Sequence, residues 1–467
     1  MAGLSRLLKI TPRELLVLTL LFAASLPAVT VRLYSGDEVQ YFAYLRSLWF
    51  DHDVSFENEY QYFYDHRIAQ SEGFHLTLLE LTTPAGRRIN YGTIGCAILW
   101  APFYAVADAG VRLSRAAGGT IAADGFSKPY IAAVAYGSAF YGFAAVLLSI
   151  GAARRVVGSH GLPSAFTVWL GTPLLFYTYV APPFAHACSA FAVALLVTIW
   201  LEVRKAWSVA GGMALALSAA LMVMVREQDI LLAAGPGVDF LLTWRQRRSS
   251  RMAVTAIAAA VAGVAGYLPQ LVAYKFLNGH FGPSSYVTRK LTWYSPHALQ
   301  VLFSPSYGFF VWTPLAVLSI IGLAMLARQP GDRTRIGASA LLMVGLQAYI
   351  SGAVESWTVA GAFGQRRFVA VSVLLVVGLA ALWRHVEGQD PPRSRRGRWA
   401  LTAAAALGVW WNLALTAEFG IGLMDRQRLE PTRNAYHAFV TLPRLAPELA
   451  YRYLFDRSSF YQPFQGK

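Results

Sequence analysis

The sequence predicts an all-α protein that crosses a membrane about eleven times. Of its 467 residues, 56% are apolar and only 14% are charged, which is too few polar side chains to cover a soluble protein of this length. Apolar runs of about 20 residues, each long enough to cross roughly 30 Å of hydrocarbon, recur along the chain. The basic residues collect in the gaps between these runs. The net charge of +15 therefore indicates membrane topology and not nucleic-acid binding.

The first expected span stays as an uncleaved anchor, because no small-x-small cleavage site precedes Arg32. Residues 91–111 are also apolar, but a span there would invert every later loop. We therefore expect residues 91–111 to form an interfacial helix. The spans are expected at residues 14–33, 130–152, 162–180, 187–203, 206–225, 229–244, 252–275, 307–327, 336–352, 368–384 and 399–418.

Alternate gaps between the spans hold the Lys and Arg residues, which places those gaps in the cytoplasm. The opposite short gap at 181–186 has neither residue type. The Ala- and Arg-rich composition and the short loops indicate a bacterial inner (plasma) membrane protein with its other loops in the periplasm. The cytoplasmic set is Arg6, Lys9, Arg13, Arg154, Arg155, Arg204, Lys205, Arg245, Arg247, Arg248, Arg251, Arg328, Arg333, Arg335, Arg384, Arg393, Arg395, Arg396 and Arg398.

This topology leaves a long external loop, which holds 11 of the 25 acidic residues and 17 aromatic residues. Such a mixture predicts a folded layer of helices on the membrane surface. The tail run 449–455 predicts another interfacial helix. The expected segments are the anchor with its preceding residues, the periplasmic loop, the helical membrane domain and the periplasmic tail, at 1–33, 34–129, 130–418 and 419–467.

Asp37 and Glu38 directly follow the first span and are flanked by aromatic residues such as Tyr41. Two adjacent carboxylates at a membrane boundary are suited to removing a proton from a hydroxyl group. The structural alternative is a helix N-terminus in which Asp37 caps a helix that begins at Glu38. The position of the pair favours catalysis.

The stretch GDEVQY at residues 36–41 resembles the GT-C superfamily. Its polyprenyl-phosphate-sugar-dependent members, such as protein O-mannosyltransferases and aminoarabinose transferases, carry an acidic pair at the start of the first external loop. The resemblance covers most of the chain as architecture but only these few residues as a motif. It implies a GT-C fold and an inverting transfer in which Asp37 is the base. The implied partners are a polyprenyl-phosphate-linked sugar donor and a lipid, glycan or protein acceptor, with no nucleic acid.

A departing lipid phosphate needs cations, so outer Arg and Lys residues are the expected donor contacts. Arg226 lies in the charged run VREQD, whose charges alternatively pair with one another. Arg366 and Arg367 begin the tenth span on its outer side, where snorkelling anchors are the alternative. Arg289 and Lys290 lie in an external stretch that is more typical of a solvated loop.

Substrate contacts are expected at Tyr41, Gln228, Trp357, Gln365 and His186. Trp357 has the flat apolar ring that stacks on a sugar, and Gln365 precedes the Arg pair. His186 begins the fourth span, and a structural interfacial histidine explains it equally well.

No cofactor is required by the sequence. The loop offers oxygen and nitrogen ligands for Ca²⁺ or Mg²⁺, but their spacing matches no metal motif. A nucleotide-sugar donor is disfavoured because the acidic centre lies on the side away from the cytosol and no nucleotide-binding fingerprint is present. The loop residues concerned are Glu57, Glu59, Asp65, His66, His75 and Glu80.

Two other functions fit the same pattern of spans. A transporter or lipid flippase also has many helices and outer charges, although transporters show repeats and broken helices near the midplane. A non-catalytic assembly subunit with a GT-C-like fold is the third reading, because a fold does not determine an activity.

Overall fold

The computed structural model describes residues 8–68, 73–388 and 390–460; Arg6 lies outside them. Within this part the chain is helical and forms no strand, apart from an isolated bridge between Thr82 and Arg88. The predicted all-α class is confirmed. The chain forms two compact units, one of Met1–Ala152 with Tyr177–Leu291 and one of Ala153–Phe176 with Thr292–Lys467.

Seven helices within the described residues are long and apolar enough to cross a membrane. Six coincide with expected spans, and the seventh, α5, is the helix expected to lie in the interface. Three further apolar helices are shorter, namely α7 (Gly161–Leu170), α10 (Val209–Val225) and α16 (Leu315–Ala327). The long ones are α5 (Gly95–Ala116), α6 (Lys128–Val156), α9 (His186–Val203), α12 (Ser250–Asn278), α17 (Asp332–Ala353), η5 with α18 (Arg366–Glu387) and α19 (Pro391–Gly420).

The expected count of about eleven spans is met only in part, because several expected spans are interrupted. Proline explains three of the interruptions, since it removes a backbone donor and crowds the preceding turn. Pro27 turns the end of α2 (Pro12–Ser25) into the short 3₁₀ helix η1 (Leu26–Ala28). Pro173 lies between α7 and α8 (Leu174–Tyr179), and Pro314 lies between α15 (Phe309–Trp312) and α16. The expected span at 229–244 begins instead as the 3₁₀ helix η4 (Glu227–Ala233), followed by α11 (Ala234–Arg247).

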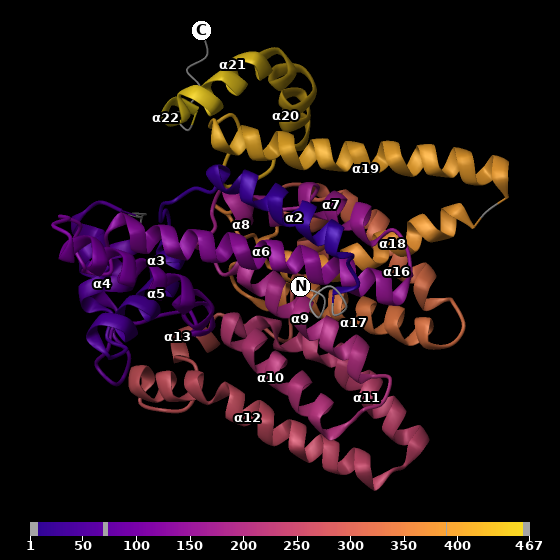
Figure 1. Cartoon of the computed structure of the whole chain (residues 1–467), viewed down its shortest axis with the longest axis horizontal. Helices are drawn as coiled ribbons and strands as arrows, with labels where there is room; N and C mark the ends of the chain where they lie inside the picture. Colours follow the sequence, from indigo (N-terminus) through magenta and orange to yellow (C-terminus); the bar gives the residue numbers. More distant parts are fainter. Residues whose placement is uncertain (1–7, 69–72, 389, 461–467) are drawn as a thin grey trace. The chain divides into compact units, whose positions relative to one another are not determined.

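In the first unit, the loop 34–129 forms the folded layer that its composition predicts. It contains α3 (Gly36–Arg46), η2 (Ser47–Asp51), α4 (Glu57–Asp65), η3 (His75–Glu80) and α5, and α3 packs against both α4 and α5 (Figure 1). Phe42 lies at the centre of this layer, with its ring edge-on to Phe63 and Tyr104. Aromatic packing therefore supplies the core of the layer.

The rest of the first unit is a layer of packed helices in which α10 contacts both α9 and α12. Gly212 and Gly266 allow this approach, because a Cβ at either position would press on Thr255 or Leu217. The other face of α12 exposes Ile257, Val261 and Val264, as expected for a lipid-facing helix. The short helix α13 (Ser285–Thr288) follows α12.

The second unit is built around α16 and α18 (Ser372–Glu387), whose backbones touch. A Cβ at Gly322 would lie 1.8 Å from the carbonyl oxygen of Gly378, and a Cβ at Gly378 would lie 2.1 Å from that of Ser319. Small residues at such crossings allow close helix packing in membranes. The remaining elements of the unit are α14 (Ala298–Phe303), η5 (Arg366–Val371), α20 (Pro431–Tyr436), η6 (His437–Thr441), α21 (Leu442–Phe455) and α22 (Arg457–Phe460); the tail helix expected at 449–455 falls within α21.

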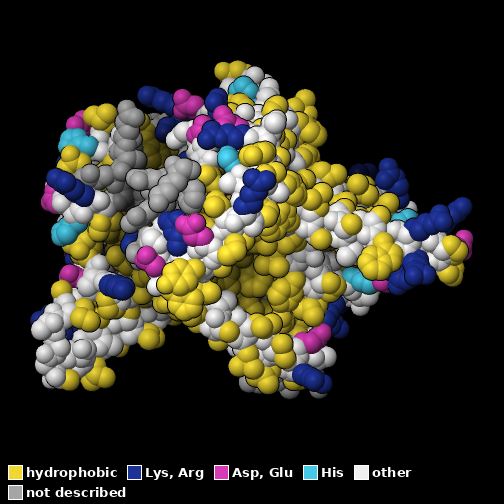
Figure 2. Space-filling model, turned by 90° about the horizontal axis from the view of Figure 1, so that it is seen from above, with side chains coloured by type: hydrophobic (Ala, Val, Ile, Leu, Met, Phe, Trp, Pro, Cys, Tyr) yellow, Lys and Arg dark blue, Asp and Glu magenta, His cyan; other side chains and the backbone are white. Residues whose placement is uncertain are grey.

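Two gaps predicted to be cytoplasmic lie at one end of this unit. Arg384, near the end of α18, donates to the carbonyl of Val157, which follows α6, and His160 lies 2.8 Å from Glu387. The second of these gaps continues into the start of α19, and dark blue side chains gather at the right-hand tip of Figure 2, where these turns lie. The exposed basic residues of these turns are Arg393, Arg395, Arg396 and Arg398.

Gly378→Ala is expected to lower the thermal unfolding temperature in detergent, because its methyl group would collide with the backbone of α16. Overpacking of this kind costs about 1–3 kcal/mol. Gly345→Ala is the matched control, since a Cβ at Gly345 on α17 meets open space. Equal unfolding temperatures for the two variants would contradict the close crossing of α16 and α18.

Candidate functional site

The acid pair begins helix α3, and its two carboxylates have different surroundings. The N-cap is Ser35, whose hydroxyl accepts from the Glu38 amide, and Glu38 returns bonds to the amides of Ser35 and Tyr34. This capping box replaces the cap at Asp37 that the sequence offered as an alternative. Glu38 is fully buried, whereas Asp37 is half-buried. Asp37 is thus the more accessible carboxylate.

Asp37, Tyr41 and Tyr44 follow one another at helical spacing along a single face of α3. The ring of Tyr41 lies against Gly92, where a Cβ would be 3.2 Å from the ring. Tyr44 is completely buried, and Gln270 of α12 lies near its hydroxyl without forming a hydrogen bond to it. Burial raises the pKa of Tyr44 well above its ordinary value. This face of α3 is therefore turned toward α12 and toward the segment that precedes α5.

Gln40 holds that segment beside α3. Its side-chain oxygen accepts from the Tyr91 amide at 2.6 Å, and its backbone carbonyl accepts from the Asn90 side chain at 3.0 Å. The Lys290 ammonium lies 4.5 Å from the centre of the Tyr91 ring, a cation–π contact. Arg289 and Lys290 are both exposed. The structure thus brings one predicted cation, Lys290, to a residue that the acid-bearing helix binds directly.

The VREQD run forms the turn between α10 and η4, and Arg226 points into the unit. Its guanidinium lies 3.1 Å from His186 Nδ1 and donates to Gln228 at 3.1 Å, and its side chain is buried. Asp229 is also buried and accepts from Ser189 at 2.6 Å. Three predicted contacts, Arg226, Gln228 and His186, therefore meet in one polar cluster.

Glu227 is a residue that sequence reasoning did not select. Its carboxylate accepts from the Tyr267 hydroxyl at 2.9 Å and interacts with Tyr274, and both tyrosines belong to α12. It also acts electrostatically on Tyr44 of α3. In the sequence, the charged run at residues 226–229 is the feature that points to Glu227. Only the fold shows that the Glu227 carboxylate faces helix α12, as Tyr44 does.

The candidates on the second unit form a separate group. Gln365 is buried and donates to the carbonyls of Tyr307 at 2.8 Å and Trp357 at 3.1 Å. Arg367 is buried too, and its guanidinium donates to the carbonyl and the hydroxyl of Ser356, each at 3.0 Å. Both side chains thus hold the loop that precedes them. Arg366 is half-buried.

Trp357 lies between two rings within this group. The His297 ring stacks on it at 5.2 Å, and the Tyr307 ring meets it edge-on at 5.8 Å. Gln365 bonds the backbone of both Trp357 and Tyr307 and so holds these two rings together, and the His297 ring stacks on Trp357. A flat aromatic surface of this kind is suited to stacking on a sugar.

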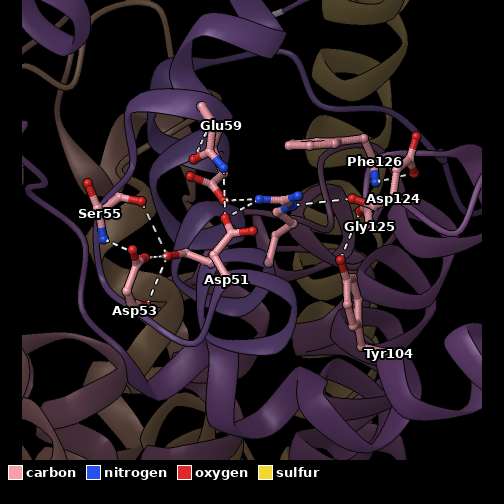
Figure 3. Close-up of polar contacts among 11 residues, drawn as sticks. Asp51, Asp53, Ser55, Glu59, Tyr104, Asp124, Gly125 and Phe126 are labelled. Carbon is pink, nitrogen blue, oxygen red and sulfur yellow. Dashed lines mark hydrogen bonds and ion pairs between the residues drawn. The ribbon is translucent and has the colours of Figure 1, made fainter.

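The other end of α3 is held by Arg46, which the sequence reasoning missed. Its guanidinium pairs with Asp51 and, at 3.0 Å, with Glu59, and it donates to the carbonyl of Asp124 at 3.2 Å. Figure 3 shows Asp51 and Glu59 on one side of this guanidinium and Asp124 on the other. The Phe126 ring lies 4.5 Å from the guanidinium carbon. Arg46 therefore joins α3 to α4 and to the segment before α6.

The loop residues considered as metal ligands have other partners. Glu57 pairs with Arg88 at 2.5 Å, and His75 pairs with Glu80 at 2.9 Å. Glu59 pairs with Arg46, as described above. Within the part of the chain that the structure describes, no group of three or more His, Cys, Asp or Glu side chains is placed to hold a metal ion.

No protein-family model and no curated protein matches the chain. Among solved structures, it is similar to ArnT from Cupriavidus metallidurans bound to undecaprenyl phosphate. The identity is 14%, the TM-score is 0.47, and the alignment covers 94% of this chain and 79% of that chain. A functional assignment must therefore be built from the residues of this chain.

The Arg46 cluster predicts a pH-dependent stability. Burial raises the pKa of Glu59 to about 7 despite its pairing with Arg46, whereas the unfolded chain has the ordinary value of 4.5. Folding therefore favours protonated Glu59, and this contribution is present below about pH 4.5 and lost as the pH rises to about 7.

Thermal and denaturant unfolding of the wild type and of Glu59→Gln measure this effect. Relative to the variant, the wild type should be more stable at pH 5 than at pH 8, by on the order of 2 kcal/mol. Glu57→Gln, in the same helix but exposed, is the control. A stability difference that does not change with pH would contradict a raised pKa at Glu59.

Proposed function

We propose that this chain is a membrane-embedded glycosyltransferase of the GT-C type, which moves a sugar from a polyprenyl-phosphate carrier to a hydroxyl acceptor. The site faces the outer side of a bacterial plasma membrane. One observation carries the proposal: Lys290 lies over Tyr91, and Gln40, two residues after the acid pair, binds the amide of Tyr91. Helix α3, which carries the two carboxylates, and the exposed ammonium group of Lys290 therefore belong to the same folded unit.

The reaction assigned to this site is a single displacement with inversion. Asp37 accepts the proton of the acceptor hydroxyl, and the hydroxyl oxygen forms a bond to the anomeric carbon of the sugar. The bond from that carbon to the phosphate oxygen breaks, and its electron pair leaves with the polyprenyl phosphate. Lys290 stabilises the negative charge that develops on the phosphate. Glu38 holds the start of α3 and is a positioning residue.

The other cations that the sequence predicts as phosphate contacts differ in how deeply their side chains are buried. Arg226 is enclosed by His186 and Gln228, so its proposed effect on a phosphate is electrostatic and acts through the cluster at the end of α10. Arg289 is exposed beside Lys290 and is a second proposed phosphate contact. In the second unit, taken by itself, half-buried Arg366 is proposed as a separate anion contact, and Arg367 supports the loop that carries Trp357.

Asp37→Asn should reduce sugar transfer by at least about 100-fold, because it removes the proton acceptor and changes the shape of the side chain little. The assay is release of free polyprenyl phosphate from crude polyprenyl-phosphate sugars by the purified protein. Glu57→Gln in the same loop serves as the control. Full activity of the Asp37 variant would remove the proposed base.

Lys290→Ala should raise KM for the donor by about 10- to 100-fold, as expected for the loss of a charge-assisted contact of about 1.5–3 kcal/mol. Lys275→Ala is a close control, because Lys275 is also exposed and lies 5.7 Å over the Phe281 ring. Equal donor KM values for the two variants would place the phosphate elsewhere.

Assays of the same purified protein distinguish glycosyl transfer from the two alternative functions. Movement of a labelled lipid across proteoliposomes with no glycosylated product would indicate a flippase. Absence of both activities in the wild type, with native unfolding behaviour, would indicate an assembly subunit. Either outcome would overturn the proposal.

A further inference from the structure

The tail helices pack against the last turns of α19 in a defined orientation. Ala438 of η6 and Leu442 and Leu449 of α21 form one buried cluster with Ala414 and Ile421 at the end of α19. A polar contact fixes the arrangement: the Asn434 amide donates to buried Glu418 at 2.6 Å. The side of α21 that turns away from α19 is therefore determined by the fold.

The surface of α21 divides into three arcs. At about 100° per residue, the first arc holds buried Leu442 and Leu449 and partly buried Leu445. The second is apolar and exposed, and comprises Pro443, Ala446, Pro447, Ala450, Tyr451 and Leu454. The third is polar and comprises Arg444, Glu448 and Arg452, of which the last two lie 3.9 Å apart. An ordinary surface helix has only the first and the third.

The exposed apolar arc is large for a surface in water. Tyr451 is 64% exposed and Leu454 is 70% exposed. Phe455, the last residue of α21, is 74% exposed, but the same helical spacing places it outside this arc, between Arg444 and Glu448. On the preceding turns, Tyr436 is 58% exposed and Phe439 is 49% exposed. A continuous apolar strip of this length marks an interaction surface.

The place along α19 where α21 packs shows which partner covers the exposed apolar strip. From exposed Trp399 to Gly420 there are about 21 residue steps, or about 32 Å, which is one thickness of membrane hydrocarbon. The Arg-rich turns precede Trp399, so Ala414 and Ile421 lie near the opposite membrane boundary. The helix that packs on them, α21, then lies at that boundary as well.

We propose that α21 lies in the membrane interface, with its exposed apolar arc in contact with the acyl chains and its polar arc among the lipid headgroups. A helix in this setting has one apolar face, one charged face and aromatic residues at the level of the headgroups. Leu407 and Trp410 of α19 are also exposed and lie one to two turns before Ala414 on the same face, so an apolar surface of α19 borders the tail cluster. Because this bordering surface belongs to an expected membrane span, lipid is favoured over a second copy of the chain as the occupant, and the proposal is independent of the enzymatic activity.

Spin labels on the full chain in phosphatidylcholine–phosphatidylglycerol vesicles test the proposal. Leu454→Cys places the label on the apolar arc, and the matched control Glu448→Cys places it on the polar arc of the same helix. The two native cysteines, Cys96 and Cys188, are buried, and the labelled wild type gives their background. Collision with O₂, which concentrates in the bilayer, is compared with collision with a water-soluble nickel chelate.

Leu454→Cys should favour O₂ severalfold more than Glu448→Cys, at a depth of about 5–10 Å below the headgroups. Nickel accessibility that is equal at both positions would show that the strip faces water and would overturn the proposal. Dipolar broadening confined to Leu454→Cys would identify a second copy as the occupant and would also overturn it. Variants with the wild-type unfolding temperature ensure that each result refers to the folded protein.

Discussion

The ion pair between the half-buried guanidinium of Arg46 and the buried carboxylate of Glu59 is the interaction on which the layer formed by residues 34–129 depends. Removing a guanidinium and the Glu59 carboxylate from water is costly, so both must be paired and hydrogen-bonded. The pairing connects α3 to α4 and to the chain before α6, three parts that are distant in sequence. Asp37 lies near the opposite end of α3, about 13.5 Å away along the helix, so its position depends on contacts that Arg46 makes at the far end.

The cost of leaving polar groups unpaired also explains why several residues of the types expected at a substrate site act as structural supports. In an apolar chain every buried polar backbone group needs a partner, because lipid offers none. Gln40, Gln365 and Arg367 each use the side chain to satisfy a neighbouring segment of backbone. Glu38 does the same at the start of α3. Asp37 and Arg366, which are half-buried, and Arg289 and Lys290, which are exposed, are the more accessible charged groups of the candidate set.

Local sequence signals predict some features of the fold correctly. For other features such signals are present, but hydrophobicity alone does not use them. The spacing of Ser35 and Glu38 is that of a capping box, and the structure has one there. Pro27, Pro173 and Pro314 interrupt apolar runs that hydrophobicity alone joins into single spans. Of the expected interfacial helix at 91–111, residues 95–111 belong to α5, which has the length and composition of a span and packs against α3.

The sequence by itself determined that the chain is helical and apolar enough for a membrane, where its charged gaps lie, and that Asp37 and Glu38 begin a layer rich in acidic and aromatic residues. These properties follow from composition and from short-range spacing. Only the tertiary structure decided that Gln40 and Tyr91 bring Lys290 to the acid-bearing helix, that Arg226 turns toward His186, and that Arg46 pairs with Glu59. Each is a contact between residues far apart in the chain, and its free energy depends on burial, which no local pattern contains.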